Sequence, residues 1–277
     1  MMNVSVLILT LNEEMNLPRC LASLKWCDDI VVLDSQSTDQ TAVIAREHGA
    51  RVVERQFDNY ANQRNFGLEK IAYAHPWLLF VDADEVVTPE LAAEIEEVLG
   101  NADSGICMYR IRRKDYLLGQ WIRRSSGYPT WFGRLVRIGR VRVEREINEE
   151  YVTDGSVQLL KEHLLHYPFN KGFHAWFEKH NRYSSMESEC LAKRDLETIS
   201  IMELLSSDPV RSRKVLKSIV YRMPGRPFLM FCGLYLIRGG FLDGRAGLMF
   251  CLLRSFYELM INCKALEAEL RKQFLPV

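Results

Sequence analysis

The sequence lacks the features of a disulfide-stabilised, exported protein. Its seven cysteines are an odd number, and no two of them form a Cys-x-x-Cys pair. A disulfide framework or a cysteine-based zinc site is therefore not expected, and a reducing cytosol fits best. The amino terminus runs directly into a strand pattern without a basic leader or a small-residue cleavage site, so no signal peptide is expected.

Long hydrophobic runs, internal repeats and low-complexity segments are also missing. The apolar block at residues 227–237 has eleven residues, whereas about 20 are needed to cross a bilayer. With 48% hydrophobic and 26% charged residues, the composition excludes wholesale disorder. A chain of 277 residues is long enough for one large domain, or for a catalytic domain with an appendage.

Acidic residues are scarce near the carboxyl terminus. Residues 1–209 hold 24 Lys+Arg and 32 Asp+Glu, a net charge of −8, whereas residues 210–277 hold 12 and 4, a net charge of +8. Such a basic tail predicts an anionic partner, either nucleic acid or membrane. Apolar blocks accompany the basic residues, which argues against nucleic acid. We therefore expect a membrane-associating helical hairpin; the alternative is a helix pair packed on the main domain.

The first hundred residues alternate strand patterns with helical patterns. Strands are predicted at residues 4–10, 30–33, 51–54 and 77–81. Helices are predicted from about residue 17, and at about 38–48, 60–72 and 89–99. This alternation predicts an α/β fold, Rossmann-like, with a mostly parallel sheet and helices on both faces. Polar clusters follow three of the strands, at 10–13, 34–39 and 82–85, where such sheets bind ligands. The arrangement is typical of a nucleotide site.

Residues 101–170 have a different pattern. Strands are predicted at residues 107–113 and 164–167, with a hairpin of 135–138 and 141–144 around Gly139. A helical pattern then runs from Gly172 to about residue 205. In the tail, apolar blocks at 227–237 and 248–261 flank a glycine-rich turn, which predicts the helical hairpin.

Asp82 and Asp84 are separated only by Ala83 and follow a predicted buried strand. Two carboxylates at this spacing can reach one divalent cation, and hard oxygen ligands suit Mg²⁺ or Mn²⁺. A cation there would neutralise a diphosphate and help it to leave. The alternative is a polar turn between strand and helix. Asp34 can accept hydrogen bonds from a base or ribose, whereas Asp39 is equally well explained as a helix cap.

Four runs, VSVLILTLNEE, VVLDSQSTDQT, NQRNFG and FVDADE, carry a resemblance to a known family. Their order and spacing over about residues 3–100 resemble the family 2 glycosyltransferases with a GT-A fold, which are inverting enzymes. The resemblance implies nucleoside contacts at Thr10, Leu11, Glu13 and Asp34. It implies that Gln63 or Arg64 lies near the base or phosphates, and that Asp82, Ala83 and Asp84 bind the diphosphate and metal.

The second half resembles a narrower branch, through GYPTWFGRLVRIGRV, INEEYVTDG, LLHYPF and KHNRYSS. This branch comprises bacterial glucosyltransferases of lipopolysaccharide core and surface-polysaccharide assembly. Inversion needs a base that deprotonates the acceptor hydroxyl, and we expect Glu149, with Glu146 and Glu150 as alternatives. Many relatives have His-Glu where this chain has Asn148-Glu149, so no role of that histidine is carried over.

Three further residues are expected around the site. His166 is expected to approach the metal or the pyrophosphate, and Arg182 to neutralise the leaving diphosphate. The alternative for Arg182 is an ordinary arginine on a helix surface. Trp131 could stack on a sugar, and the alternative is an ordinary core tryptophan. His163 and His166 do not form a convincing zinc pair, because no third ligand is evident.

The sequence thus predicts a transferase that moves a hexose or N-acetylhexosamine from a nucleotide sugar, expected to be UDP-linked, to a lipid-linked saccharide. Mn²⁺ or Mg²⁺ is the expected cofactor, and the inner face of the cytoplasmic membrane the expected location. Residues 1–170 are predicted to form the catalytic domain, in which 1–100 bind the nucleotide sugar and 101–170 bind the acceptor and supply the base. Residues 171–209 are predicted to form a helical segment, and residues 210–277 a membrane-associating region. The alternatives are a polyprenyl-phosphate sugar synthase and a non-catalytic membrane-associated scaffold. A nucleotidyltransferase would need a glycine-rich loop with a following lysine after the first strand, which is missing.

Overall fold

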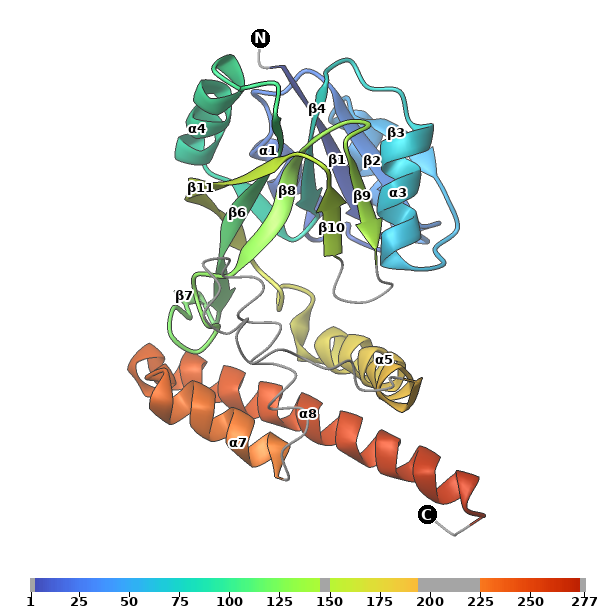
Figure 1. The fold of residues 1–277 in the computed structure, drawn as a ribbon, viewed down its shortest axis with the longest axis vertical. Coiled ribbons are helices and arrows are strands. Elements are labelled where there is room, and N and C mark those ends of the chain that lie inside the picture. Colours follow the sequence, from blue (N-terminus) through green and yellow to red (C-terminus); the bar gives the residue numbers. More distant parts are fainter. Residues whose placement is uncertain (1–2, 145–149, 194–224, 275–277) are drawn as a thin grey trace. The chain divides into compact units, whose positions relative to one another are not determined.

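The computed structural model describes residues 3–144, 150–193 and 225–274, which form two compact units (Figure 1). Unit 1 comprises Met1–Asp115 and Pro129–Lys171, and unit 2 comprises Tyr116–Tyr128 and Gly172–Val277. A short segment from the middle of the chain therefore belongs with the carboxyl-terminal helices. The end of the predicted helical segment and the start of the predicted basic tail lie outside the described residues.

Unit 1 is built on one large mixed sheet, with strands in the order β3-β2-β1-β4-β8-β6-β11-β5. Its strands are β1 (Val4–Thr10), β2 (Ile30–Asp34), β3 (Arg51–Glu54), β4 (Trp77–Asp82), β5 (Glu85–Val87), β6 (Ile106–Leu117), β8 (Trp131–Arg137) and β11 (Ser156–His166). Its helices are α1 (Leu17–Ala22), α2 (Thr41–Glu47), α3 (Tyr60–Lys70) and α4 (Pro89–Gly100). The strands β3, β2, β1 and β4 are mutually parallel, as predicted.

The alternation of side chains along β1 explains why both faces of this sheet are covered. Val4, Val6 and Ile8 pack into one core with residues of α1, α2 and α4. Leu7 packs into a second core on the other face, together with residues of α3 and of β9 (Val141–Glu144). Because successive strand residues point to opposite faces, a run that is apolar on both faces must be covered on both. The predicted α/β architecture is therefore confirmed.

The predicted hairpin around Gly139 is wrong. β8 lies in the large sheet between β4 and β6, antiparallel to both, and β9 pairs instead with β10 (Glu150–Thr153) in a separate two-stranded sheet. Gly139 does turn the chain, with a φ of 79°. A turn between two strands sets only their connection, and in the large sheet Leu135 and Val136 of β8 are fully buried. The predicted strand at 164–167 is the end of the much longer β11.

Unit 2 contains α5 (Gly172–Lys193), α7 (Arg226–Cys232) and α8 (Gly244–Lys272). A π-helical turn, Gly233–Ile237, continues α7, and a 3₁₀ turn, Gly240–Asp243, leads into α8. α8 packs against both α5 and α7, so the predicted helical hairpin is present. The segment 116–128 contributes the short strand β7 (Gln120–Trp121), which pairs with the end of β6.

The segment Gly240–Lys272 is long and apolar enough to cross a membrane by length and composition, the only such helix among the described residues. Part of it is nevertheless core, because 39% of its most apolar window is buried within the protein. Arg226 and Glu258 form a buried ion pair between α7 and α8, with Arg226 Nε 2.6 Å from Glu258 Oε2. Lys264 Nζ donates to Asn181 Oδ1 at 2.7 Å and so ties α8 to α5.

Candidate active site

Three strands of the large sheet end in polar residues at the same edge. β1 ends at Thr10, β2 at Asp34 and β4 at Asp82, and the parallel register places these ends side by side. The strand order reverses at β1, because β2 and β3 lie on one side of it and β4 on the other. In open α/β sheets such a reversal opens a crevice beyond the carboxyl ends of the strands, where ligands bind.

Asp34 organises the edge at β1 and β2. Its carboxylate is buried and accepts hydrogen bonds from Thr10 Oγ1 at 2.7 Å, from Ser37 Oγ at 2.6 Å and from the Ser37 backbone N–H at 2.8 Å. The loops after β1 and β2 also contact each other directly. The Asn12 N–H donates to Ser37 Oγ, and Asn12 Oδ1 accepts from the Thr38 N–H, each at 2.8 Å. These hydrogen bonds fix the loops after β1 and β2 against each other.

Two residues in these loops, Asn12 and Gln36, have left-handed backbone conformations with φ of 54° and 61°. Non-glycine residues with positive φ are uncommon, although asparagine tolerates the conformation best. Asp39, for which the sequence left two explanations, accepts from the Thr41 N–H at 3.0 Å at the start of α2. Its carboxylate therefore accepts a hydrogen bond from the backbone at the first residue of α2.

Glu13 is engaged by protein side chains. It accepts from Lys171 Nζ at 2.5 Å and from Asn16 Nδ2 at 2.8 Å, and Lys171 Nζ also donates to the Leu11 carbonyl at 3.3 Å. Burial raises the pKa of Glu13 and outweighs the opposing effect of Lys171. The Leu11 side chain is 40% exposed, so of these neighbours it is the one open to a ligand.

Gln63 and Arg64 are both buried on α3. Gln63 accepts a hydrogen bond from Arg55 and donates through Nε2 to Ser35 Oγ at 3.2 Å, beside the β2 loop. Arg64 Nη2 donates to Asp82 Oδ1 at 3.0 Å. The structure therefore brings Arg64 to the Asp82-Ala83-Asp84 motif and places Gln63 nearer the Asp34 loop.

Asp82 sits between two arginines. Arg64 bonds one carboxylate oxygen, and Arg134 Nη2 bonds the other at 2.5 Å. Burial by itself would raise the pKa of Asp82, but Arg134 and Arg64 outweigh it and hold the pKa well below its usual value. Asp82 is thus an anion whose oxygens are both occupied by guanidinium groups.

Glu85 extends this cluster. It accepts from Arg134 Nη2 at 2.7 Å through Oε1 and from the Asp82 N–H at 2.9 Å through Oε2, and it is fully buried. Burial raises the pKa of Glu85 despite the opposing effect of Arg134. Arg113 Nη1 lies 3.5 Å from the same carboxylate and links it to Asp115, which accepts from Arg113 Nε at 3.0 Å.

Asp84 faces His166. Its Oδ2 lies 3.3 Å from His166 Nε2, while His166 Nδ1 lies 2.6 Å from Asp115 Oδ1 on the other side of the ring. Burial and Arg113 lower the pKa of His166, but Asp84 and Asp115 outweigh them and raise it to about 9. The imidazole is held between two carboxylates.

Strand register explains why these residues meet. On β11, His166 is the partner of Asp115 on β6 and of Glu85 on β5. A row of charged residues therefore crosses three neighbouring strands, and the Tyr167 N–H donates to the Asp84 carbonyl at 2.9 Å, which ties the motif to the end of β11. Four carboxylates (Asp82, Asp84, Glu85, Asp115) face three guanidinium groups (Arg64, Arg113, Arg134) and one imidazole.

Arg113, Asp115 and Arg134 were not predicted as site residues. Arg113 and Asp115 share one face of a strand, and Arg134 stands in a strand beside an otherwise apolar run. Of the three, only Arg113 lay within a predicted strand, where a charged residue at an inward position was the available signal, because a buried charge needs a partner. Which partners they meet depends on long-range strand pairing.

The other predicted residues lie elsewhere or outside the described residues. Glu149 and Glu146 fall outside them, and Glu150 is exposed at the start of β10. Arg182 is exposed on α5, in unit 2. Trp131 is half-buried at the start of β8, with the Arg112 guanidinium carbon 5.4 Å from its ring centre.

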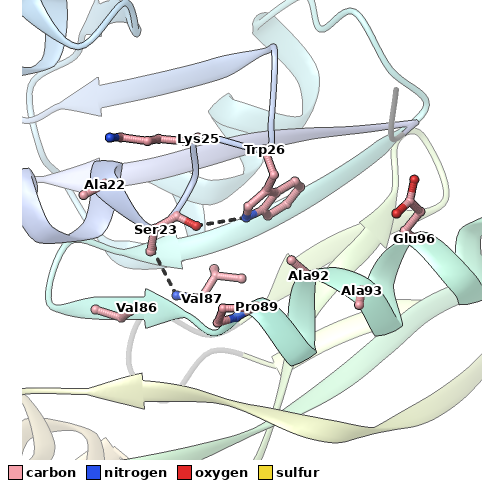
Figure 2. A pocket seen from close by; sticks show the side chains of 10 residues that line it. All are labelled: Ala22, Ser23, Lys25, Trp26, Val86, Val87, Pro89, Ala92, Ala93 and Glu96. Atoms are coloured by element: carbon pink, nitrogen blue, oxygen red, sulfur yellow. Dashed lines mark hydrogen bonds between the residues drawn. The ribbon is translucent and has the colours of Figure 1, made fainter.

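A separate pocket lies among α1, β5 and α4 (Figure 2). Its lining is mostly apolar, and Figure 2 shows Ser23 bonded to both Trp26 and Val87 at its edge. The carboxylates and arginines described above do not line it. We place the candidate active site at the charged row, because the groups capable of binding a cation and phosphates are there.

Comparisons with known proteins identify the family to which the chain belongs. The sequence profile described as Glycosyl transferase family 2 matches residues 5–151, more than half of the chain. The lipopolysaccharide core biosynthesis glycosyltransferase LpsC of Rhizobium meliloti is 32% identical over 161 residues, covering 56% of this chain but only 58% of LpsC. An uncharacterized glycosyltransferase of Rickettsia felis is 27% identical over 206 residues, covering 70% of this chain and 72% of that protein.

Among solved structures, the mannosyltransferase PcManGT from Pyrobaculum calidifontis, in complex with GDP-Man and Mn²⁺, is similar with a TM-score of 0.55. The two share 17% identity, and the match covers 95% of this chain and 87% of that one. At this identity the likeness concerns the fold, and it confirms the predicted GT-A architecture.

Proposed function

The chain belongs to glycosyl transferase family 2, and we propose that it transfers a sugar from a nucleotide sugar with the help of a divalent cation bound by Asp84 and His166. The observation that carries this proposal is the approach of Asp84 Oδ2 to His166 Nε2, 3.3 Å apart, beside the arginine-bound Asp82. Carboxylate and neutral imidazole are both ligands of Mn²⁺, and carboxylate is the preferred protein ligand of Mg²⁺. Because the pKa of His166 is raised to about 9, binding of the cation would displace a proton from its ring.

The distance between the two groups fits a shared cation. Neighbouring ligands of an octahedral cation with bonds of about 2.1 Å are roughly 3 Å apart. Among the described residues, no set of three or more His, Cys, Asp or Glu side chains is arranged to hold a metal. Two protein ligands suit a cation that takes its other ligands from substrate phosphates and water. When bound, the cation would neutralise the diphosphate and help it to leave.

The sequence predicts that Asp82 contacts the metal directly, whereas in this proposal Asp82 binds arginines. Both of its oxygens are bonded to arginines, so it holds Arg64 and Arg134 at the sheet edge and fixes the start of the motif. Ala83, between Asp82 and Asp84, is buried in the core. Thr10, Leu11, Glu13, Asp34 and Gln63 form the nucleoside side of the site in this proposal.

Glu149 remains our proposed base, which would take the proton from the acceptor hydroxyl as that oxygen attacks the anomeric carbon. Glu149→Gln should leave nucleotide binding unchanged and reduce the transfer rate by about a hundredfold or more. Glu144→Gln, at an exposed carboxylate on β9, is the matched control. If Glu149→Gln turns over at the wild-type rate, the base is another residue.

The donor and acceptor are proposed from chemistry and from relatives. We propose a UDP-linked hexose or N-acetylhexosamine as donor and a lipid-linked saccharide as acceptor, in cell-surface polysaccharide or lipopolysaccharide assembly. The name of LpsC, with which the chain shares 32% identity, supports this class of acceptor. The basic, apolar tail supports action at the cytoplasmic face of a membrane, and the exposed Arg182 is proposed to neutralise the leaving diphosphate.

A screen of nucleotide sugars by thermal shift, with Mn²⁺ and with EDTA, tests donor and metal together. We expect one nucleotide family to raise the melting temperature only with the cation, since a ligand that binds only the folded state stabilises it. Asp84→Ala should abolish the shift, and Asp154→Ala, an exposed carboxylate of unit 1, should retain it. If the wild-type protein binds no nucleotide with the cation present, the proposal fails.

A further inference from the structure

The turn between α7 and α8 exposes a cluster of large apolar side chains. Leu236, Ile237, Phe241 and Leu242 are 57%, 85%, 50% and 60% exposed. Single exposed apolar residues are ordinary, but four within seven residues at one turn form a patch. We call residues 236–242 the hairpin tip.

The geometry of the turn keeps these side chains outside. Gly240 and Gly247 are in backbone contact, because a Cβ on Gly247 would lie only 2.1 Å from the Gly240 carbonyl oxygen. A Cβ on Gly240 would lie 2.7 Å from the Leu234 carbonyl oxygen and 3.1 Å from Cys251 Sγ. The inner side of the turn is filled by backbone and has no room for a side chain. Exposure of the apolar residues is therefore a fixed property of the hairpin.

The acidic residue beside the tip is turned inward. Asp243 is buried, and its Oδ2 accepts from the N–H groups of Arg124 and Ser125 at 2.8 and 2.7 Å and from Ser125 Oγ at 2.7 Å. Asp243 is the only Asp or Glu between residues 225 and 257 of the sequence. Its bonds remove a negative charge from the surface and tie the segment 116–128 to the hairpin.

Arginines from both segments border the apolar patch. Arg124 and Arg238 are exposed. The Arg124 Cδ would lie 3.6 Å from a Cβ on Gly239, and Arg238 Nη1 would lie 3.1 Å from a Cβ on Gly127, so each arginine crosses to the other segment. Arg123 and Arg245 are exposed nearby in the sequence. An apolar centre with a cationic rim is complementary to an anionic bilayer surface, which is apolar below and negative above.

We propose that the hairpin tip enters the headgroup region of an anionic bilayer, with Arg124 and Arg238 binding lipid phosphates. This deepens the proposed membrane-associated function, on which it rests, and places the contact in one turn of unit 2. α7 and α8 also expose Phe228, Leu252 and Phe256, but other side chains of the hairpin pack within the protein. Glu258 is fully buried against Arg226, and Tyr257 and Ile261 are buried in the core of unit 2. An interfacial contact leaves this packing intact, whereas a membrane-spanning α8 would break it.

Co-sedimentation with vesicles of phosphatidylcholine, with and without phosphatidylglycerol, tests the proposal in the full-length protein. Ile237→Asp/Phe241→Asp should weaken binding to the anionic vesicles by about tenfold or more, because two apolar side chains that enter the bilayer are replaced by charged ones. Val43→Asp/Leu159→Asp is the matched control, since both of its residues are exposed apolar side chains of unit 1. That control should bind as the wild type does.

Arg124→Ala/Arg238→Ala provides the second arm. It should lose about tenfold in binding to anionic vesicles, with no change on phosphatidylcholine alone, and its remaining binding should depend less on salt. Hydrogen exchange of the wild-type protein gives a readout that needs no substitution. Peptides covering residues 236–242 should become protected when anionic vesicles are added.

Vesicle binding equal to wild type in Ile237→Asp/Phe241→Asp would overturn the proposal. So would a wild-type dimer that the same double variant converts to a monomer without loss of vesicle binding, because the tip would then be a self-association surface. Nucleotide binding with Mn²⁺, measured on the same variants, separates this test from that of the proposed function. We expect nucleotide binding to be unchanged.

Discussion

Asp115 lies on the far side of the His166 ring from Asp84. Its carboxylate is 2.6 Å from His166 Nδ1 and is itself held by Arg113. Burial would raise the pKa of Asp115, but Arg113 and His166 outweigh it and lower the pKa, so the carboxylate is charged. A carboxylate behind a metal-binding histidine fixes the orientation of the ring and strengthens it as a ligand.

Asp115→Asn should weaken Mn²⁺-dependent nucleotide binding by about tenfold to a hundredfold. Isothermal calorimetry with Mn²⁺ and the nucleotide measures the affinity, and the melting temperature without metal reports any loss of folding. Asp154→Asn, at an exposed carboxylate of the same unit, is the control. Unchanged affinity in Asp115→Asn would show that Asp115 does not position His166.

His180 on α5 predicts a pH dependence of stability for unit 2. Its ring stacks on Trp176 with centroids 3.7 Å apart and meets Tyr257 edge-on, while Nδ1 donates to the Trp176 carbonyl. Burial lowers the pKa of His180 from 6.5 to about 4, and Arg254 and Lys179 act in the same direction. Between these values the unfolded chain binds a proton that the folded chain does not.

The stabilisation due to neutral His180 is therefore complete above about pH 6.5 and is lost as the pH falls towards 4. The chemical-denaturation midpoint should fall over this range in the wild type and fall less in His180→Phe, which keeps an aromatic ring without the titrating group. An equal fall of the midpoint with pH in the two proteins would show that His180 is not the group responsible.

Among the elements, the parallel strands were the easiest to predict. β1, β2 and β4 are short and apolar on both faces, and β1 and β2 are also rich in β-branched residues. This local pattern identifies a buried strand without knowledge of its neighbours. β8 and β11 could not be predicted in this way. Their places depend on pairing with strands distant in sequence, which residue periodicity does not encode. For the same reason the Asp82 motif was foreseen, but Arg134, which bonds Asp82, and Asp115, which bonds His166, were not.

The helical hairpin of unit 2 depends on the contact of Gly247 with the Gly240 carbonyl. Gly247→Ala should destabilise unit 2 by about 1–3 kcal/mol, because a methyl group would be forced against backbone that cannot yield. Gly233→Ala is the matched control, since nothing lies within 4 Å of a Cβ there. Thermal denaturation measures both. A Gly247→Ala variant as stable as Gly233→Ala would show that the hairpin does not require this contact.

At the scale of the whole molecule, the first part of the chain is acidic and the last part is basic. The acidic residues of the first 209 positions include the carboxylates of the candidate site, whereas the last 68 residues carry a net charge of +8. In this account unit 1 binds the nucleotide sugar through Asp84 and His166, and unit 2 binds the membrane that carries the acceptor. The sequence predicted a membrane-associating tail from its charge and apolar blocks, and the exposed side chains of the structure led us to propose the hairpin tip as the contact.

The most direct test of the account is transfer of radiolabelled sugar from the donor found in the screen to the lipid fraction of a bacterial membrane extract. We predict that the wild-type protein labels the lipid fraction with Mn²⁺ and not with EDTA, and that Asp84→Ala is slower by at least about a hundredfold. Labelling at the wild-type rate by Asp84→Ala, or by the wild-type protein in EDTA, would contradict the account.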